Sequence, residues 1–168
     1  MEKTQRFIEE LKNNDCEVFL VDSSKLREDL IKFLKSEGAD RILVRPSELI
    51  NSLGLDGHFD LVQGIEDGVR FGISEPEFGI VYSGGLVELA RNIEEKVPSL
   101  LPDVHVAILK EENIIEDFDE LISGLNPPLP DITFIVGPSK TADIEKILVK
   151  GAHGPARLVV FIVKRGSI

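Results

Sequence analysis

Short apolar runs alternate with segments of helical spacing along this chain, and this alternation most constrains how it can fold. Residues 17–21, 41–44 and 104–109 each have the length and composition of a buried strand. Residues 26–34 lie between the first two runs and carry apolar side chains at helical spacing. Strands joined through helices pair mainly in parallel, because a parallel neighbour needs a long crossover connection.

The expected fold is therefore α/β: a single three-layer domain over residues 1–168, in which helices cover a mixed, mostly parallel sheet. The middle of the chain leaves alternatives open. Residues 69–73 and 79–82 are short strand candidates that flank a turn at residues 75–77. They form either a hairpin, as an antiparallel addition to the sheet, or a compact crossover. Residues 86–97 fit either a strand followed by a loop or a helix.

The composition is that of an ordinary folded protein, with 42% hydrophobic and 29% charged residues. No apolar run approaches the roughly 20 residues that cross a bilayer, and the first residues lack the apolar core of a signal peptide. We therefore expect a cytoplasmic protein with no membrane partner. A formal charge of −11, with no basic cluster longer than Lys164-Arg165, makes nucleic acid an unsuitable partner as well.

The few metal-binding side chains limit the redox chemistry of the chain. The single cysteine, Cys16, cannot form an internal disulfide or supply the roughly four thiolates of an iron–sulfur cluster. The three histidines, His58, His105 and His153, show no metal-ligand spacing. We expect no metal site and no cofactor, so another subunit would have to carry any electrons.

The C-terminal third contains a strand, a tight turn and a helix in succession. The apolar run at residues 132–136 enters a Gly137-Pro138 turn, and helical spacing returns over residues 141–150. A last apolar run follows at residues 158–163. This order predicts a closing β-α-β unit.

The turn after Gly137 carries groups that suit a small anionic ligand. Backbone N–H groups at a helix start would lie beside two hydroxyls and the ammonium of Lys140. Ligands prefer the edge at which parallel strands end, and a second glycine-rich turn follows another strand candidate. The predicted ligand-binding residues are Ser83, Gly84, Gly85, Gly137, Ser139, Lys140 and Thr141. An equally weighted interpretation is that the Gly137 turn only ends a strand and caps a helix.

The histidines fall elsewhere in the expected sheet. His105 lies at the start of a strand and His153 follows a helix, so both are expected at the opposite edge from the glycine turns. Together with Arg157 they form a predicted partner surface or second site. The alternative for each histidine is a purely structural role in hydrogen bonding.

Three motifs carry a resemblance to a known family. They are G-P-S-K-T-A-D-I-E at residues 137–145, G-A-H-G-P-A-R-L at 151–158 and S-L-L-P-D-V-H at 99–105. The chain resembles the LUD domain, the lactate-utilisation protein C family, with specific motifs between about residues 72 and 163. One motif departs from the family pattern, because Tyr82 stands where the family has glutamate. The resemblance implies a fold similar to the sugar-phosphate isomerase and CoA-transferase group.

The resemblance also implies a function. It favours an accessory or ligand-binding subunit of a system that oxidises lactate to pyruvate, without its own redox centre and with iron–sulfur and dehydrogenase subunits as partners. The alternative is a small-molecule enzyme acting on a phosphorylated or CoA-linked substrate. No serine, histidine and acid constellation is recognisable in the sequence, so no catalytic residue is assigned.

Overall fold

The computed structural model describes residues 2–138 and 154–166. Its centre is a six-stranded sheet in which all neighbouring strands run parallel. The strands lie in the order β1 (Glu17–Val21), β11 (Arg157–Val163), β7 (Val104–Lys110), β4 (Phe71–Ser74), β2 (Arg41–Val44), β3 (Asp60–Val62). The predicted α/β class with a mostly parallel sheet is confirmed.

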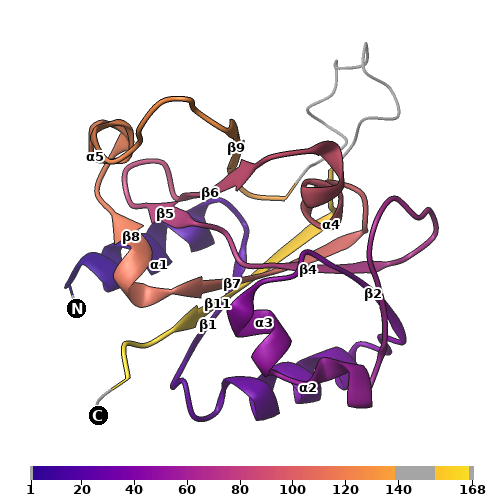
Figure 1. Cartoon of the computed structure of the whole chain (residues 1–168). Helices are drawn as coiled ribbons and strands as arrows, with labels where there is room; N and C mark the ends of the chain where they lie inside the picture. The colour runs from indigo at the N-terminus through magenta and orange to yellow at the C-terminus, as the bar shows by residue number, and fades with distance from the viewer. Residues whose placement is uncertain (1, 139–153, 167–168) are drawn as a thin grey trace.

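Helices cover one face of this sheet (Figure 1). They are α2 (Leu26–Ser36), α3 (Glu48–Ser52) and the short 3₁₀ helix η1 (Leu55–Gly57). Leucines repeat every four residues along α2 and therefore lie on one side of it, where they pack against the sheet. No helix among residues 2–138 and 154–166 is long and apolar enough to cross a bilayer.

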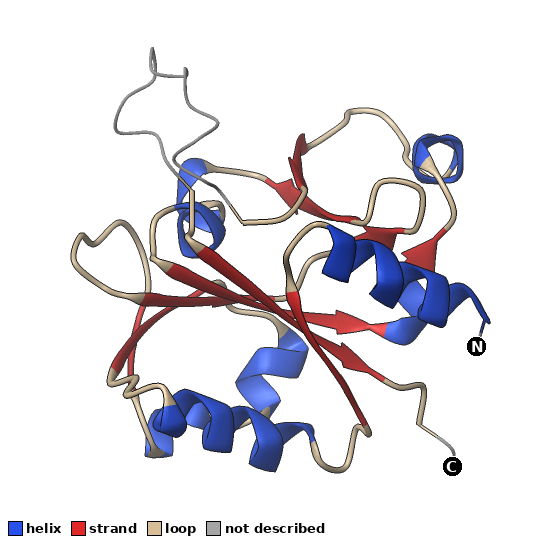
Figure 2. Ribbon diagram, turned by 180° about the vertical axis from the view of Figure 1, so that it is seen from behind, coloured by secondary structure: helices blue, strands red, loops and turns tan. Residues whose placement is uncertain are grey.

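A second, smaller sheet and α1 (Glu2–Asn13) cover the opposite face of the large sheet (Figure 2). The strands of the small sheet lie in the order β8 (Ile114–Ile115), β5 (Phe78–Ile80), β6 (Gly85–Ala90), β9 (Asp131–Ile135). β6 runs antiparallel to β5 and β9, whereas β5 and β8 are parallel. The small sheet and α1 form the third layer of the domain.

Short helices connect the two sheets: η2 (Ile93–Glu95), α4 (Val97–Leu100) and η3 (Glu111–Asn113). A further short helix, α5 (Phe118–Ser123), joins β8 to β9 within the small sheet. α4 lies close against β4, and Gly72 makes this approach feasible. A Cβ atom at Gly72 would lie 2.0 Å from the carbonyl oxygen of Pro98. Any larger residue at this position would therefore push α4 away from the sheet.

The structure differs from the sequence expectation in how the strands are shared between sheets. The segment after β4 is a crossover, because β4 belongs to the large sheet and β5 to the small one. The antiparallel hairpin is formed by β5 and β6, and residues 86–97 follow the strand-then-loop alternative. β9 and β11 lie in different sheets, so they do not close a β-α-β unit. The predicted helix at 141–150 lies outside the described residues.

The connections of the large sheet change direction between β2 and β4. From β2 the chain moves outward to β3, whereas from β4 it moves the opposite way to β7. Adjacent parallel strands whose connections leave in opposite directions open a crevice at their carboxyl ends, and open α/β sheets bind ligands at this point. The fold therefore places a candidate site beyond Val44 and Ser74, where these two strands end.

Candidate functional site

A pocket of about 520 Å³ lies at the carboxyl ends of β2 and β4. Residues 45–47 follow β2 and form one wall, and residues 75–77 follow β4 and form another. Leu89, Arg91 and Glu95, which lie in and after β6, complete the ionic end. The volume is in the range of pockets that hold small organic ligands, roughly 300–1,000 Å³.

The two walls have the same local construction. β2 ends before Arg45-Pro46 and β4 ends before Glu75-Pro76. Proline has no N–H to donate to a sheet ladder, so each strand stops where a charged side chain can face the pocket. Ser47 then begins α3, and its Oγ accepts the N–H of Ile50 at 3.1 Å.

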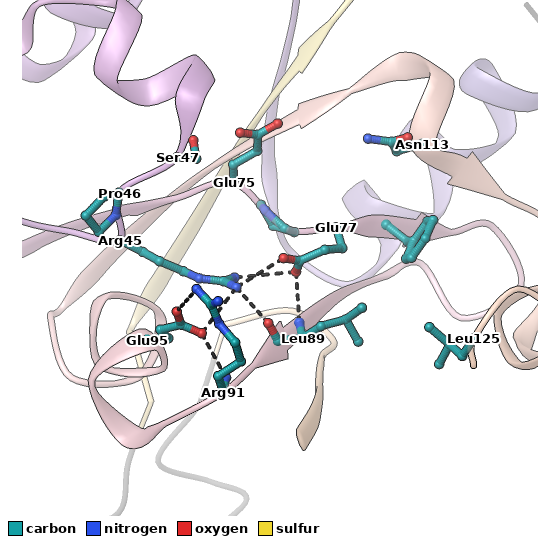
Figure 3. Close-up of a pocket in the computed structure, with 12 residues that line it drawn as sticks. Arg45, Pro46, Ser47, Glu75, Glu77, Leu89, Arg91, Glu95, Asn113 and Leu125 are labelled. Carbon is teal, nitrogen blue, oxygen red and sulfur yellow. Dashed lines mark hydrogen bonds and ion pairs between the residues drawn. The ribbon is translucent and has the colours of Figure 1, made fainter. Parts of the chain in front are cut away.

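The Arg45 guanidinium joins the two sheets inside the pocket (Figure 3). Its Nη2 donates to the carbonyl oxygen of Leu89 at 2.7 Å and to Oε2 of Glu77 at 3.0 Å. The Glu77 carboxylate also accepts the Leu89 N–H at 2.8 Å. With a side chain only 11% exposed, Arg45 is a fixed part of the site.

A second arginine and a second carboxylate lie beside Arg45. Glu95 accepts the backbone N–H of Arg91 at 2.8 Å and its Nη2 at 3.0 Å. These hydrogen bonds, the backbone one first, lower the pKa of the Glu95 carboxyl group, so it remains ionised well below neutral pH. The Arg91 side chain is 84% exposed and lies on the solvent side of this pair.

A buried polar network lies directly behind the pocket, between the two sheets. Ser74 donates to Oε2 of Glu88 at 2.5 Å and lies 2.7 Å from Nε2 of His105. Ser99, on α4, lies 2.8 Å from Oε1 of the same carboxyl group. Glu88 is 1% exposed and His105 is 0% exposed. The four side chains therefore join β4, β6, β7 and α4 away from solvent.

The surroundings of Glu88 favour its protonated form. The Ser99 hydroxyl has one proton, yet it lies within hydrogen-bonding distance of both Glu88 Oε1 and the carbonyl oxygen of Lys96, at 2.8 and 3.0 Å. Ser99 donates to one of these two oxygens at a time, and a proton on Glu88 would allow both contacts to be hydrogen bonds at once. Burial independently raises the pKa of Glu88, which favours the same neutral form.

His105 is uncharged in the same network. Burial lowers its pKa to about 3, so the contact of 3.9 Å between its Nε2 and Glu88 is not an ion pair. With Nε2 as donor to Ser74, the bare Nδ1 is an acceptor that has no partner among the described residues. The network is thus held together by hydrogen bonds and not by ion pairs. It holds Ser74 and Glu88, the residues that immediately precede the pocket residues Glu75 and Leu89.

The two predicted glycine turns lie side by side on the small sheet. Asn14 Nδ2 donates to the carbonyl oxygens of Ser83 and Gly84 at 3.0 and 3.1 Å, and Gly137 packs against the Asn14 backbone. Gly84 and Gly137 have φ of +64° and +73°, which explains why glycine is needed at both. A Cβ atom at Gly85 would lie 2.9 Å from the Ile135 carbonyl oxygen.

The described residues of these turns form hydrogen bonds within the protein. The Gly84 N–H donates to the Ile80 carbonyl oxygen at 2.9 Å, and the Asn14 amide binds carbonyl oxygens. Ser139, Lys140 and Thr141 lie outside the described residues, so the anion site stays a prediction. Tyr82, at the position of the family glutamate, is 80% exposed on the neighbouring surface.

The residues predicted for a partner surface differ in their exposure to solvent. His105 and Arg157 both lie at amino ends of neighbouring strands, β7 and β11. Arg157 is half-buried and binds the carboxylates of Glu17 and Glu37, each with a contact of 2.7 Å. His105 exposes no ring surface and belongs to the buried network. His153 lies outside the described residues.

The sequence motifs and the fold are matched by one family. The LUD domain family pattern matches residues 66–163, which include β4, the small sheet, β7 and most of the pocket and network. The chain belongs to the LUD domain family. The predicted resemblance is confirmed, and Arg45 and β2 lie before the matched region.

Two relatives align with most of the chain, and a third aligns with about half of it. The uncharacterized protein YkgG of Escherichia coli is 28% identical, over 89% of this chain and 73% of its own length. The lactate utilization protein C of Anoxybacillus flavithermus is 28% identical over 84% of this chain and 71% of its own length. That of Halalkalibacterium halodurans is 34% identical, but the alignment spans 55% of this chain and 44% of that protein.

A solved structure shares the fold. A crystal structure of a DUF162 family protein from Deinococcus radiodurans superposes with a TM-score of 0.71 and covers 96% of each chain. The sequence identity is 19%, so this likeness concerns the fold of the LUD domain and not its ligand.

Sequence reasoning missed the residues of the pocket and most of the network. Arg45, Glu77 and Glu95 carry no motif, although a charged residue before proline ends each strand at the pocket. Glu88 has a clearer signal, because it is the one charged residue inside the apolar strand at 85–90. A carboxyl group in the middle of a buried strand needs hydrogen-bond partners, and this requirement points to a polar cluster.

Proposed function

We propose that this LUD domain protein is a ligand-binding accessory subunit of a cytoplasmic lactate-utilisation system, without a redox centre of its own. The observation that carries the proposal is its alignment with proteins named lactate utilization protein C, which reaches 84% of the chain for the Anoxybacillus relative. The pocket at the switch between β2 and β4 supports a role in binding a small molecule.

The cysteine supports the assignment of electron transfer to partner subunits. Cys16 is buried, and its burial raises the pKa of the thiol to about 11. A protonated, buried thiol is a poor metal ligand, and one cysteine cannot replace the four of an iron–sulfur centre. We therefore assign the electron-carrying steps of lactate oxidation to iron–sulfur and dehydrogenase subunits that act with this chain.

The pocket also allows a second candidate function, that of an enzyme. A volume of about 520 Å³ would accommodate part of a phosphorylated or CoA-linked substrate, which the superfamily resemblance allows. In this alternative the isolated protein would convert such a substrate. In the accessory role it would bind a ligand and leave it unchanged.

Complementation tests the pathway role. A bacterium that grows on lactate and lacks its own lactate utilization protein C should regain growth on lactate when it expresses this chain. Growth on glucose, together with an immunoblot, controls for viability and protein level. Absent growth on lactate, with the folded protein present, would contradict the proposal.

A second measurement tests the accessory role separately. The purified chain should not reduce an artificial electron acceptor in the presence of either lactate isomer. Turnover of lactate by the isolated chain, or stoichiometric iron and sulfide in protein purified without oxygen, would contradict a subunit without its own redox centre.

A further inference from the structure

We propose that Arg45 and Arg91 form a binding site for the carboxylate of a small monocarboxylic acid, and that Glu95 occupies the place of this carboxylate in the ligand-free protein. The inference names a ligand class, and it rests on the ligand-binding part of the proposed function. The pathway itself plays no role in the argument.

The position of Glu95 carries the inference. Its carboxylate lies between two guanidinium groups at the ionic end of the pocket (Figure 3). Oε2 is 3.0 Å from Nη2 of Arg91, and Oε1 is 3.9 Å from Nη2 of Arg45. Paired guanidinium groups are a common means of holding a carboxylate, because their N–H groups match its two oxygens.

The contacts of Glu95 can be exchanged, whereas those of Glu77 cannot. Glu77 binds both terminal nitrogens of Arg45 and the Leu89 N–H, and it thereby fixes the guanidinium. The 3.9 Å distance from Arg45 to Glu95 is too long for a hydrogen bond. Glu95 keeps an ion pair with Arg91 at the surface, where such pairs contribute little to stability. It also accepts the Arg91 N–H at 2.8 Å, and a ligand carboxylate can accept this N–H in its place.

The charge balance selects a monocarboxylate over a phosphate. Two arginines and three carboxylates line the pocket. The Lys110 Nζ lies 3.6 Å from Oε2 of one of these carboxylates, Glu75. A ligand with one negative charge that displaces Glu95 leaves this balance unchanged. A phosphate group carries about 1.5 to 2 negative charges at neutral pH and would add repulsion from Glu75 and Glu77.

The other end of the pocket suits an uncharged molecular body. Figure 3 shows Leu125 at the opposite end from Arg91 and Glu95, and Phe78 also lines the pocket. Asn113 adds one amide group for hydrogen bonding. The ligand would place its carboxylate between the arginines and its less polar carbon chain towards Phe78 and Leu125.

A matched pair of variants tests the inference. Glu95→Gln and Glu94→Gln remove the same charge one residue apart in η2, but Glu94 is exposed and does not line the pocket. L-lactate, pyruvate, butyrate and inorganic phosphate would be titrated against each protein and followed by the backbone amide signals. We expect Glu95→Gln to bind a monocarboxylate about tenfold more tightly than the native protein, because the competing carboxylate is gone. Glu94→Gln should bind like the native protein.

Two further observations localise the effect. Ligand binding to the native protein should shift the Arg91 amide signal, because displacement of Glu95 releases this N–H. Replacing Arg91 by Gln in the Glu95→Gln protein should weaken binding again, and Glu95→Ala should reproduce Glu95→Gln if the latter is poorly folded. The absence of saturable monocarboxylate binding to the Glu95 variants, equal affinities of Glu95→Gln and Glu94→Gln, or tighter binding of phosphate would overturn the inference. The growth test is independent, so a failure of either proposal can be told from a failure of the other.

Discussion

Ser99 lies 2.8 Å from Oε1 of Glu88, although the two side chains come from a short helix and from the middle of a strand in the small sheet. The contact joins α4 to β6 behind the pocket, and burial of the carboxyl group favours its protonated form. Buried polar clusters stabilise a fold only when each member is satisfied, so their protonation states are part of the structure. The first two predictions concern these states.

Glu88→Gln should preserve the fold and alter its dependence on pH. Because the pKa of Glu88 is raised in the folded protein, its contribution to stability is complete below the unfolded value of about 4.3 and is lost as pH rises through the folded pKa. Gln stays neutral, so the difference in unfolding free energy between variant and native protein should move in favour of the variant as pH rises. Urea unfolding between pH 5 and pH 9 measures this difference. A constant difference, equal to that of the exposed control Glu94→Gln, would refute a protonated Glu88.

His105→Gln should change the acid limb of the stability curve. The pKa of His105 is lowered to about 3, so stability is present above the unfolded value of about 6.5 and falls as pH decreases from there towards 3. Each pH unit in this window costs up to about 1.4 kcal/mol in the native protein. The variant should have a lower free energy of unfolding at pH 7, but this free energy should no longer fall as the pH decreases from 6.5 towards 3. His58→Gln, at an exposed position, should retain the native slope.

Gly72→Ala should disrupt the attachment of α4. The new methyl group would meet the Pro98 carbonyl oxygen at 2.0 Å, so the helix must move and carry Ser99 away from Glu88. We expect a loss of at least about 2 kcal/mol in the free energy of unfolding. Gly57→Ala is the control, because a Cβ atom at Gly57 would point into open space, with no atom within 4 Å. Similar melting temperatures for the two variants would contradict the close packing of α4 on β4.

Cys16 should react slowly with thiol reagents in the folded protein. Its burial raises the pKa of the thiol to about 11, so very little thiolate is present at pH 8. Labelling by iodoacetamide should be slow in buffer and should accelerate when the protein is unfolded in urea. The rate relative to glutathione at the same pH measures the effect, and equal rates for the folded protein and glutathione would show that the thiol is accessible.

The parallel sheet could be predicted from the sequence because local patterns determine it. Residues 17–21, 41–44 and 104–109 have strand-like runs that coincide with β1, β2 and most of β7. Which sheet a strand joins was not predictable for 78–80 or 131–135, because their short apolar runs fit either sheet. Contacts far along the chain decide the outcome, as when β6 pairs with β9 across more than forty residues of sequence.

The candidate site was harder to predict because its parts come from separate strands. Arg45, Glu77 and Glu95 meet only after β2, β4 and β6 have been placed, and none of the three belongs to a recognisable motif. His105 was singled out by its motif, but its burial depends on the small sheet that the sequence did not reveal. The motif at 139–145 lies outside the described residues, so its predicted anion site stays a prediction.

The order of strands has a consequence for how the protein is made. β1 pairs with β11, which is the last strand of the large sheet to leave the ribosome and lies between β1 and β7. β1 therefore has no strand partner in the large sheet until residues 157–163 have been synthesised. Contacts this distant in sequence slow folding and leave apolar strands open to aggregation in the meantime. Growing chains of this protein should depend on chaperones until residues 157–163 have emerged.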